Sequence, residues 1–133
     1  MHILVATDRE VLVIDVERGT STLARGIDDR PTCLAADVLV RRRAWCGTHR
    51  GGVFRSDDGG WTWQPIGLAG RLIMAVAASS AKRDVVWAGT EPSEVWRSGD
   101  AGNSWEQTSD LTTLPSSPEW SFPPRPETHH VRW

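Results

Sequence analysis

The stretch RSDDGGWTW occupies residues 55–63, and a near copy, RSGDAGNSW, occupies residues 97–105. The two copies begin 42 residues apart, and the same offset relates WCGT at residues 45–48 to WAGT at residues 87–90. The repeat therefore includes a whole structural unit and not only the nine-residue motif. A period of about 40–45 residues built from short strands is typical of the four-stranded blade of a β-propeller.

Each unit is predicted to contain four short strands separated by turn-forming residues. In the first complete unit the expected strands are residues 32–36, 44–47, 53–56 and 62–66. In the second they are residues 73–77, 84–89, 94–97 and 104–108. The intervening loops are rich in Gly, Pro, Ser, Asp and Asn, which favour turns. No segment shows a convincing helical period.

A degenerate copy of the unit lies upstream. Ala6 and Thr7 align with Gly47 and Thr48 at an offset of 41. At the same offset the motif positions are taken by Asp15, Glu17, Gly19, Ser21 and Thr22. This copy is expected to keep an acid and the glycine but to lack the first serine and the tryptophan. It begins at its second strand, near residues 3–7.

These observations predict an all-β chain of about three propeller blades. Blade boundaries are expected near residues 1–30, lacking the inner strand, 31–68 and 69–112, with a long loop and the start of another blade at 113–133. Propellers usually have four to eight blades. We therefore expect a fragment or incomplete product of a larger propeller. The alternative is a ring of several copies, because open blades expose unpaired edges and apolar faces that favour self-association.

The repeated motif is expected to lock the turn between the third and fourth strands. Gly60 and Gly102 can adopt a positive φ angle in a tight reversal. The carboxylates of Asp58 and Asp100 can accept hydrogen bonds from the N–H groups of the turn. Hydroxyl groups are supplied by Ser56, Thr62, Ser98 and Ser104, and the tryptophans expected to start the fourth strands are Trp63 and Trp105.

Calcium binding is the other interpretation of these acids, but a calcium loop needs several oxygen ligands at alternating positions. Here only one acid recurs, so a structural lock is preferred.

The pattern Ser-x-Asp-x-Gly-x-(Thr/Ser)-Trp resembles the Asp-box, or BNR repeat, of propellers in the sialidase-like superfamily and of related BNR-repeat proteins. With the degenerate copy, the resemblance covers about residues 3–110. It implies a β-propeller. It also implies that the motif lies at the outer edge of each blade, away from the face that binds ligands.

Composition sets limits on the partners. The chain has 133 residues, a net charge of −2 and 39% hydrophobic residues, so we expect neither a nucleic acid nor an anionic membrane as its partner. The apolar run at the N-terminus is too short for a signal peptide, so a cytoplasmic protein is expected. Cys33 and Cys46 lie in apolar runs and are interpreted as buried free thiols. No cofactor or metal site is predicted.

The candidate site is expected on the propeller face that carries the loops between strands two and three and the links to the next blade. Those loops carry Arg9, His49, Arg50 and Glu91. The long insertion at residues 114–130 adds Glu119, Trp120, Arg125, His129 and His130. Such groups could hold a glycan or protein ligand. In the alternative interpretation, Trp120 caps the blade and the histidines are solvated.

Two further groups of residues receive structural interpretations. Arg41, Arg42 and Arg43 are interpreted as a solvated turn, with a polyphosphate partner as the alternative. Trp45, Trp87 and Trp96 are interpreted as packing between blades.

Two functions from different classes remain open. A non-catalytic binding or assembly scaffold is favoured. The alternative is part of a sialidase-like exo-glycosidase. The resemblance implies that such enzymes use a Tyr nucleophile and an arginine cluster, whereas the chain contains no Tyr and no early Arg-Ile-Pro motif. As it stands it is expected not to hydrolyse sialosides. An assembly factor like those that help build photosystems would share the fold, although no residue singles it out.

Overall fold

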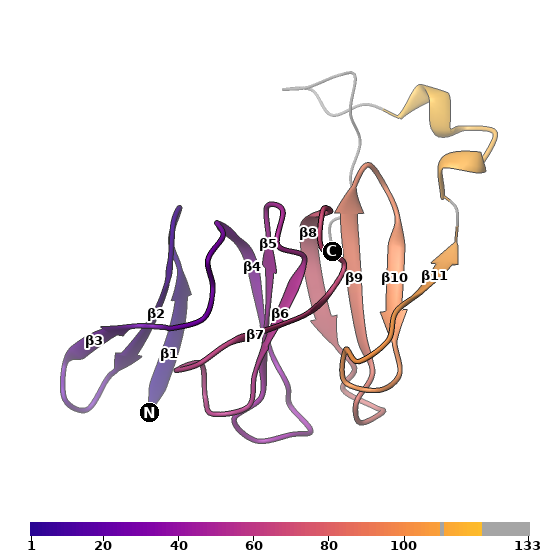
Figure 1. The fold of residues 1–133 in the computed structure, drawn as a ribbon. Coiled ribbons are helices and arrows are strands. Elements are labelled where there is room, and N and C mark those ends of the chain that lie inside the picture. Colours follow the sequence, from indigo (N-terminus) through magenta and orange to yellow (C-terminus); the bar gives the residue numbers. More distant parts are fainter. Residues whose placement is uncertain (110, 121–133) are drawn as a thin grey trace.

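Three antiparallel sheets stand side by side in the computed structural model, each built from a contiguous part of the chain (Figure 1). The structure describes residues 1–109 and 111–120. Blade 1 contains β1 (His2–Ala6), β2 (Val11–Asp15) and β3 (Thr20–Leu23). Blade 2 contains β4 (Pro31–Ala36), β5 (Ala44–Thr48), β6 (Val53–Ser56) and β7 (Gln64–Gly67). Blade 3 contains β8 (Leu72–Ala78), β9 (Val86–Glu91), β10 (Val95–Ser98) and β11 (Glu106–Ser109). The predicted all-β class is confirmed.

Consecutive strands pair within every blade, and the blades stack through their faces. β4 and β5 both pack against β8, and β1 packs against β4. β1 therefore takes the position of β5, as the repeat predicts. Within the described part of the chain no strand pairs with the free edge of β1.

Successive side chains of a strand point to opposite faces of the sheet. The two faces of a blade can therefore contribute to two different cores. β5 is buried along its whole length. It sends Trp45 toward blade 3, and Ala44 and Cys46 toward blade 1. The core between blades 1 and 2 contains Val11, Ala44, Cys46, Phe54 and Trp63. The core between blades 2 and 3 contains Trp45, Val53, Ile73, Val76, Val86, Ala88 and Ala101.

The two cysteines are free thiols, as the sequence suggests. Cys46 is fully buried, and burial raises the pKa of its thiol to about 12.

The fourth strands begin later than predicted. β7 and β11 start one residue after Trp63 and Trp105, which therefore precede the strands instead of opening them. At the first position the reason is visible in the backbone. The Trp63 N–H donates to the Arg25 carbonyl (2.8 Å), and the Arg25 N–H donates to the Trp61 carbonyl (2.9 Å). This segment thus pairs with the end of blade 1 before it joins its own sheet.

Blade 1 differs from the predicted alignment by one residue. Ile3, the counterpart of Ala44, pairs with Ile14, whereas Ala44 pairs with Ser56. Ile14, and not Asp15, therefore stands at the position of Ser56, because the loop after Thr7 is one residue shorter than the loop after Thr48. The shift follows from this shorter connection and not from the motif itself.

The corner of blade 1 is closed by an acid other than the predicted Glu17. The Asp15 carboxylate accepts the N–H groups of Glu17 and Arg18, both at 3.1 Å. Glu17 pairs with the N-terminal amine at 3.0 Å.

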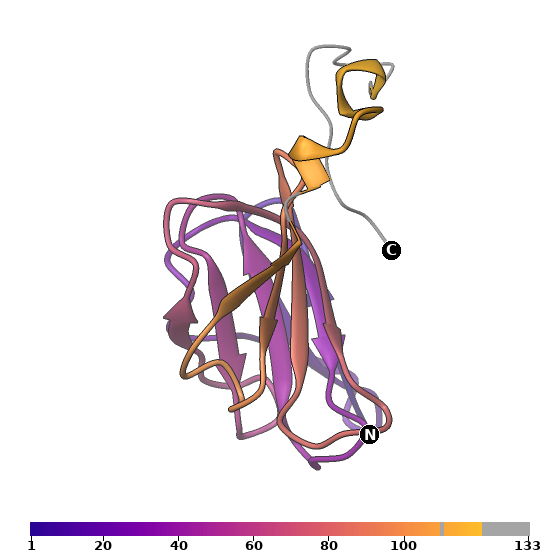
Figure 2. The ribbon, with the colours of Figure 1, turned by 90° about the vertical axis from the view of Figure 1, so that its right-hand side faces the viewer.

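Two short 3-10 helices that the sequence did not indicate follow β11. They are η1 (Leu111–Thr113) and η2 (Ser117–Glu119), and they lie beyond the upper end of blade 3 (Figures 1 and 2). Among residues 1–109 and 111–120, no helix has the length and apolar character needed to span a lipid bilayer.

Candidate functional site

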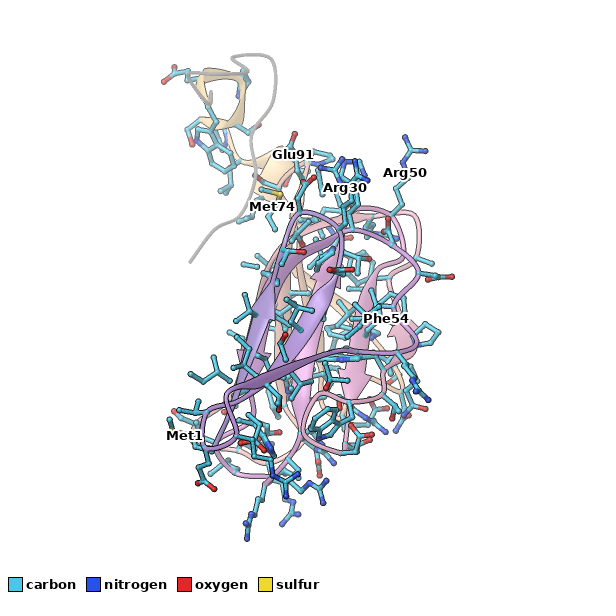
Figure 3. All side chains as sticks on the ribbon, turned by 90° about the vertical axis from the view of Figure 1, so that its left-hand side faces the viewer. Met1, Arg30, Arg50, Phe54, Met74 and Glu91 are labelled. Carbon is cyan, nitrogen blue, oxygen red and sulfur yellow. The ribbon has the colours of Figure 1, made fainter. Side chains whose placement is uncertain are left out.

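The upper end of the sheets in Figure 1 is formed by the loops that follow β1, β5 and β9 and by the links between blades. We call this surface the loop face. Figure 3 shows Arg30, Arg50 and Glu91 at this end and Met1 at the opposite end. The opposite end carries the repeated motifs, residues 55–63 and 97–105, and we call it the corner face.

A recurring threonine shapes each loop of the loop face. Thr7 donates its N–H (2.8 Å) and its hydroxyl (3.0 Å) to the Glu10 carbonyl. Thr48 does the same with the Gly52 carbonyl at 3.0 and 2.8 Å. Thr90 donates its N–H to the Glu94 carbonyl at 3.1 Å and its hydroxyl to the Pro92 carbonyl at 2.6 Å. The loops are therefore held in place before any ligand arrives. The sequence showed that this threonine recurs but gave it no role.

Asp29 connects the end of blade 1 to the loop of blade 2. Its carboxylate accepts the backbone N–H groups of Arg50 and Gly51, the latter at 2.7 Å. Burial acts to raise the pKa of Asp29, but these N–H donors outweigh it and lower the pKa to about 2. The Gly70 N–H in turn donates to the Arg50 carbonyl at 2.7 Å. The loop of blade 2 is thereby fixed between its two neighbours.

A hollow of about 500 Å³ opens at the blade 1 side of the loop face. It is lined by Asp8, Arg9, Asp28, Asp29 and Arg30. Arg30 Nη2 lies 2.7 Å from Asp8 Oδ1, and Arg30 Nε donates to the Asp8 carbonyl at 3.3 Å. Arg30 and Asp8 therefore neutralise each other in the wall of the hollow.

Two guanidinium groups on this surface remain uncommitted. The side chains of Arg9 and Arg50 are exposed and have no hydrogen bond or ion pair with any residue in the described part of the chain. Figure 3 shows the Arg50 side chain projecting from the loop face. Because the loop backbone is already held in place, the guanidinium groups of Arg9 and Arg50 can bind a carboxylate without a rearrangement of the loops.

The predicted site residues are distributed over the loop face and do not form one cluster. Arg9, His49, Arg50 and Glu91 belong to its loops, but of these only Arg9 lines the hollow. Glu119 and Trp120 lie at η2, beyond blade 3, at the other end of the row of blades from the hollow (Figure 1). Three predicted residues lie outside the described residues: Arg125, His129 and His130.

Four residues that line the hollow are not among the predicted site residues: Asp8, Asp28, Asp29 and Arg30. The available signal was the run of two acids and an arginine, residues 28–30, in the link between the first two blades.

The first corner, residues 55–63, is a closed hydrogen-bond network. The Ser56 hydroxyl donates to Asp58 Oδ1 (2.8 Å) and accepts the Gly60 N–H (2.9 Å). Asp58 Oδ1 also accepts the N–H groups of Trp61 and Thr62, both at 3.0 Å, and Oδ2 accepts the Thr62 hydroxyl at 2.6 Å. Burial acts to raise the pKa of Asp58, but the Thr62, Ser56 and Trp61 donors lower it to about 2.

The second corner, residues 97–105, repeats this network. The Ser98 hydroxyl donates to Asp100 Oδ1 (2.7 Å) and accepts the Gly102 N–H (2.8 Å). Asp100 accepts the Ser104 N–H (2.8 Å) and hydroxyl (2.6 Å), which lower its pKa to about 2. Both oxygens of each acid are thus engaged within the turn. No three His, Cys, Asp or Glu residues in the described ranges are grouped so that they could hold a metal ion.

Among the three consecutive arginines, Arg41 and Arg42 are exposed, as a solvated turn requires, but Arg42 and Arg43 form specific contacts. Arg42 Nη2 donates to the Asp58 carbonyl at 2.8 Å. Arg43, whose side chain is only 15% exposed, forms ion pairs with Asp57 (3.1 Å) and with Asp84 of blade 3. Arg43 therefore joins two blades, which corrects the interpretation of this segment as a solvated turn.

Of the three tryptophans predicted to pack between blades, Trp45 is buried there and Trp96 packs against the same core. Trp87 is 38% exposed, so for Trp87 the prediction is wrong.

A larger hollow of about 810 Å³ lies on the corner face between β1 and β4. Its walls include Leu4 of β1 and Leu34 of β4, together with Arg41 and Arg42. In blades 2 and 3 an inner strand pairs at the position that corresponds to the free edge of β1. This hollow therefore marks the incomplete first blade and is not a formed ligand pocket.

Solved structures share this arrangement of blades. An ancestral GH74 enzyme matches 80% of the chain with a TM-score of 0.69 at 16% identity, over 16% of its own length. YCF48 bound to D1 peptide matches 80% of the chain with a TM-score of 0.64 at 16% identity, over 36% of its length. YCF48 from Cyanidioschyzon merolae matches 68% of the chain with a TM-score of 0.56 at 24% identity, over 27% of its length. The chain thus spans about a sixth to a third of the neighbours it matches.

No family model matches the chain, and no curated protein matches it. At these identities the structural likeness establishes the β-propeller fold alone.

Proposed function

We propose that this chain is a non-catalytic propeller of the Asp-box type that holds a segment of another protein on its loop face. The two uncommitted guanidinium groups, Arg9 and Arg50, support this proposal most directly. They stand on loops that Thr7, Thr48 and Asp29 already fix, so binding of a carboxylate ligand would order the ligand and the two arginine side chains but would not need to order the loops. The repeated corners, which match the Asp-box pattern, support the assignment to that type of propeller.

A protein ligand fits this surface better than a glycan. The loops and links at residues 7–10, 27–30, 49–52, 68–71 and 91–94 contain no Trp, Tyr or Phe on which a sugar ring could stack. Trp120, the remaining aromatic candidate among the described residues, lies at η2, at the other end of the row of blades from the hollow. They offer charged groups and backbone atoms, which suit an extended acidic peptide. The complex of YCF48 with D1 peptide supports the general idea, because it shows that a protein with a similar fold binds a peptide.

The proposal is tested with arrays of acidic, basic and neutral synthetic peptides and with a glycan array. The chain should retain acidic peptides, and the double variant Arg9→Ala/Arg50→Ala should lose at least about tenfold in affinity. Arg83→Ala is the matched control, because it removes an exposed arginine from the β8–β9 loop at the opposite end. Retention of glycans alone, or equal peptide binding by the double variant, would contradict the proposal.

The alternative function, part of a sialidase-like glycosidase, needs its own assay. Asp8 and Asp28 are acids in the wall of the hollow, but Asp8 is engaged by Arg30. Release of fluorophore from a fluorogenic sialoside by the purified chain would favour the enzyme over the binding module.

A further inference from the structure

The outer face of blade 3 repeats a face that is buried inside the molecule. In blade 2, Trp45 pairs across the sheet with Ala35 and Arg55. In blade 3, Trp87 pairs in the same way with its counterparts Ala77 and Arg97. Blade 3 covers the Trp45 face completely, and Trp45 is 0% exposed. Trp87 is 38% exposed. Blade 3 stands at the end of the molecule that faces the viewer in Figure 2.

The outer face of blade 1 corresponds to the second side of the interface between blades 2 and 3, which is the face of blade 3 that packs on blade 2. Ile3 pairs with Ile14, and Leu12 pairs with both Val5 and Leu23, so these five apolar side chains share the face that points away from blade 2. Ile3 is 46% exposed and Leu23 is 52% exposed. Figure 3 looks onto this end of the molecule. The equivalent residues of blade 2, Ala44, Cys46 and Phe54, are buried against blade 1.

We propose that two copies of this chain associate head to tail, with the outer face of blade 3 of one copy packed on the outer face of blade 1 of the other. The two faces match the two sides of interfaces that the chain already forms internally. Because the contact joins unlike faces, each copy keeps a free face until the assembly closes into a ring, and without closure the contact would extend into an open filament. Two copies give six blades, which lies within the usual range for propellers.

A polar contact at the rim supports the same partner. Arg55 reaches across from blade 2 and donates to the Ala101 carbonyl in the corner of blade 3 at 2.7 Å. Arg97, its counterpart in blade 3, pairs with Glu106 on its own sheet at 3.0 Å, and its guanidinium carbon lies 5.7 Å from the centroid of the Trp87 ring. Arg97 is therefore placed to make the Arg55 contact with the corner of blade 1 in a second copy. An exposed apolar face with this rim fits another propeller blade better than an unrelated surface.

The test is the mass of the full chain in solution, measured by light scattering after size exclusion. Wild-type protein should have twice the 14.7 kDa chain mass. Leu23→Asp on one face and Trp87→Glu on the other should each give the mass of a single chain, because a buried unpaired carboxylate disrupts the contact. Val38→Asp is the matched control, since Val38 is 71% exposed in the β4–β5 loop, outside both faces, and this variant should keep the doubled mass.

Mixing the two disruptive variants distinguishes unlike faces from like faces. The Leu23→Asp chain keeps its blade 3 face, and the Trp87→Glu chain keeps its blade 1 face, so an equimolar mixture should recover the doubled mass through one intact contact. If like faces pair instead, Leu23→Asp or Trp87→Glu alone will keep the doubled mass, which would overturn the proposal.

A wild-type chain of single mass would also overturn it. Circular dichroism checks that both variants stay folded, and Arg97→Glu, at the rim, supplies a second disruption of the blade 3 face. Neither face contains Arg9 or Arg50, so these results are independent of ligand binding on the loop face.

Discussion

The two corners on the corner face have the same internal lock but different ties to the preceding blade. In both, a serine hydroxyl and an aspartate carboxylate collect the donors of the turn. The Trp63 indole donates to the Gly60 carbonyl of its own corner at 2.8 Å. The Trp105 indole instead reaches back to the Ile66 carbonyl of blade 2 at 2.9 Å. The hydrogen bonds within the corner, which we call the lock, are therefore a local property of the motif. The contact with the preceding blade, which we call the tie, depends on which backbone groups of that blade lie within reach.

Each of these two tryptophans lies against a glycine that precedes its corner in the chain. One glycine contacts the backbone of its tryptophan, and the other contacts the indole ring. A Cβ atom at Gly26 would collide with the Trp63 carbonyl, which belongs to the backbone. A Cβ atom at Gly67 would lie 2.8 Å from Cδ1 of the Trp105 ring, which is a side chain. Both glycines have positive φ angles, 91° and 128°. The first corner is thus joined to blade 1 through backbone, and the second to blade 2 through an indole.

The largest effect is expected from alanine at these glycines. Gly26→Ala should lower the free energy of unfolding by about 3–5 kcal/mol, because the left-handed backbone and a backbone collision both oppose it. Gly67→Ala should cost about 2–3 kcal/mol, because the Trp105 ring can shift. Gly70→Ala, with φ of 85° and no atom within 4 Å of the new Cβ, should cost only about 1–2 kcal/mol. Urea unfolding of the three variants gives the order, and a Gly67→Ala loss larger than that of Gly26→Ala would reverse the comparison.

A smaller effect is expected when either indole donor is removed: the lost hydrogen bond costs about 1 kcal/mol, and the loss of buried ring volume adds to this cost at Trp63, which lies in the core. Trp105→Phe breaks the tie to blade 2, and Trp63→Phe breaks a bond inside its own corner. A double-mutant cycle separates the two cases. The cost of Gly67→Ala should fall in the Trp105→Phe background, because the smaller ring relieves the contact, and should be unchanged in the Trp63→Phe background. Equal coupling in both backgrounds would show that the tryptophans are not tied differently.

The difference between lock and tie also explains what the sequence could predict. Ser56, Asp58 and Thr62 lie within seven residues, so their spacing alone indicated a hydrogen-bonded turn. The bond from Trp105 to Ile66 spans 39 residues and depends on how two blades pack, which no local pattern reports. The repeat therefore predicts the strands and corners, whereas the contacts between blades depend on how the blades pack and have no counterpart in the local sequence.

The loop face follows the same rule. Arg50 could be predicted because it stands in a turn between two strands. Asp29 was missed because its partners are backbone N–H groups 21 and 22 residues away. The alignment predicted Glu17 as the corner acid because it did not take into account that the loop after Thr7 is one residue shorter than the loop after Thr48. In the structure, Asp15 is the acid that accepts the N–H groups of the turn.

The smallest expected effect is on the loss of stability at acidic pH. It tests whether the hydrogen-bond networks of the two corners are equivalent. Asp58 and Asp100 both have a pKa of about 2, below the ordinary value of 3.8, because donors in the turn stabilise the carboxylate. A carboxyl group whose pKa is lowered on folding stabilises the protein above pH 3.8, and this stabilisation is lost as the pH falls toward 2. Unfolding by urea at pH 6 and pH 3 should therefore show a loss at pH 3 that is smaller in Asp58→Asn and in Asp100→Asn than in the wild type. Asp28→Asn, which alters a carboxylate without a hydrogen bond among the described residues, should keep the wild-type difference. If only one of the two corner variants flattens the pH dependence, the locks are unequal despite their matching geometry.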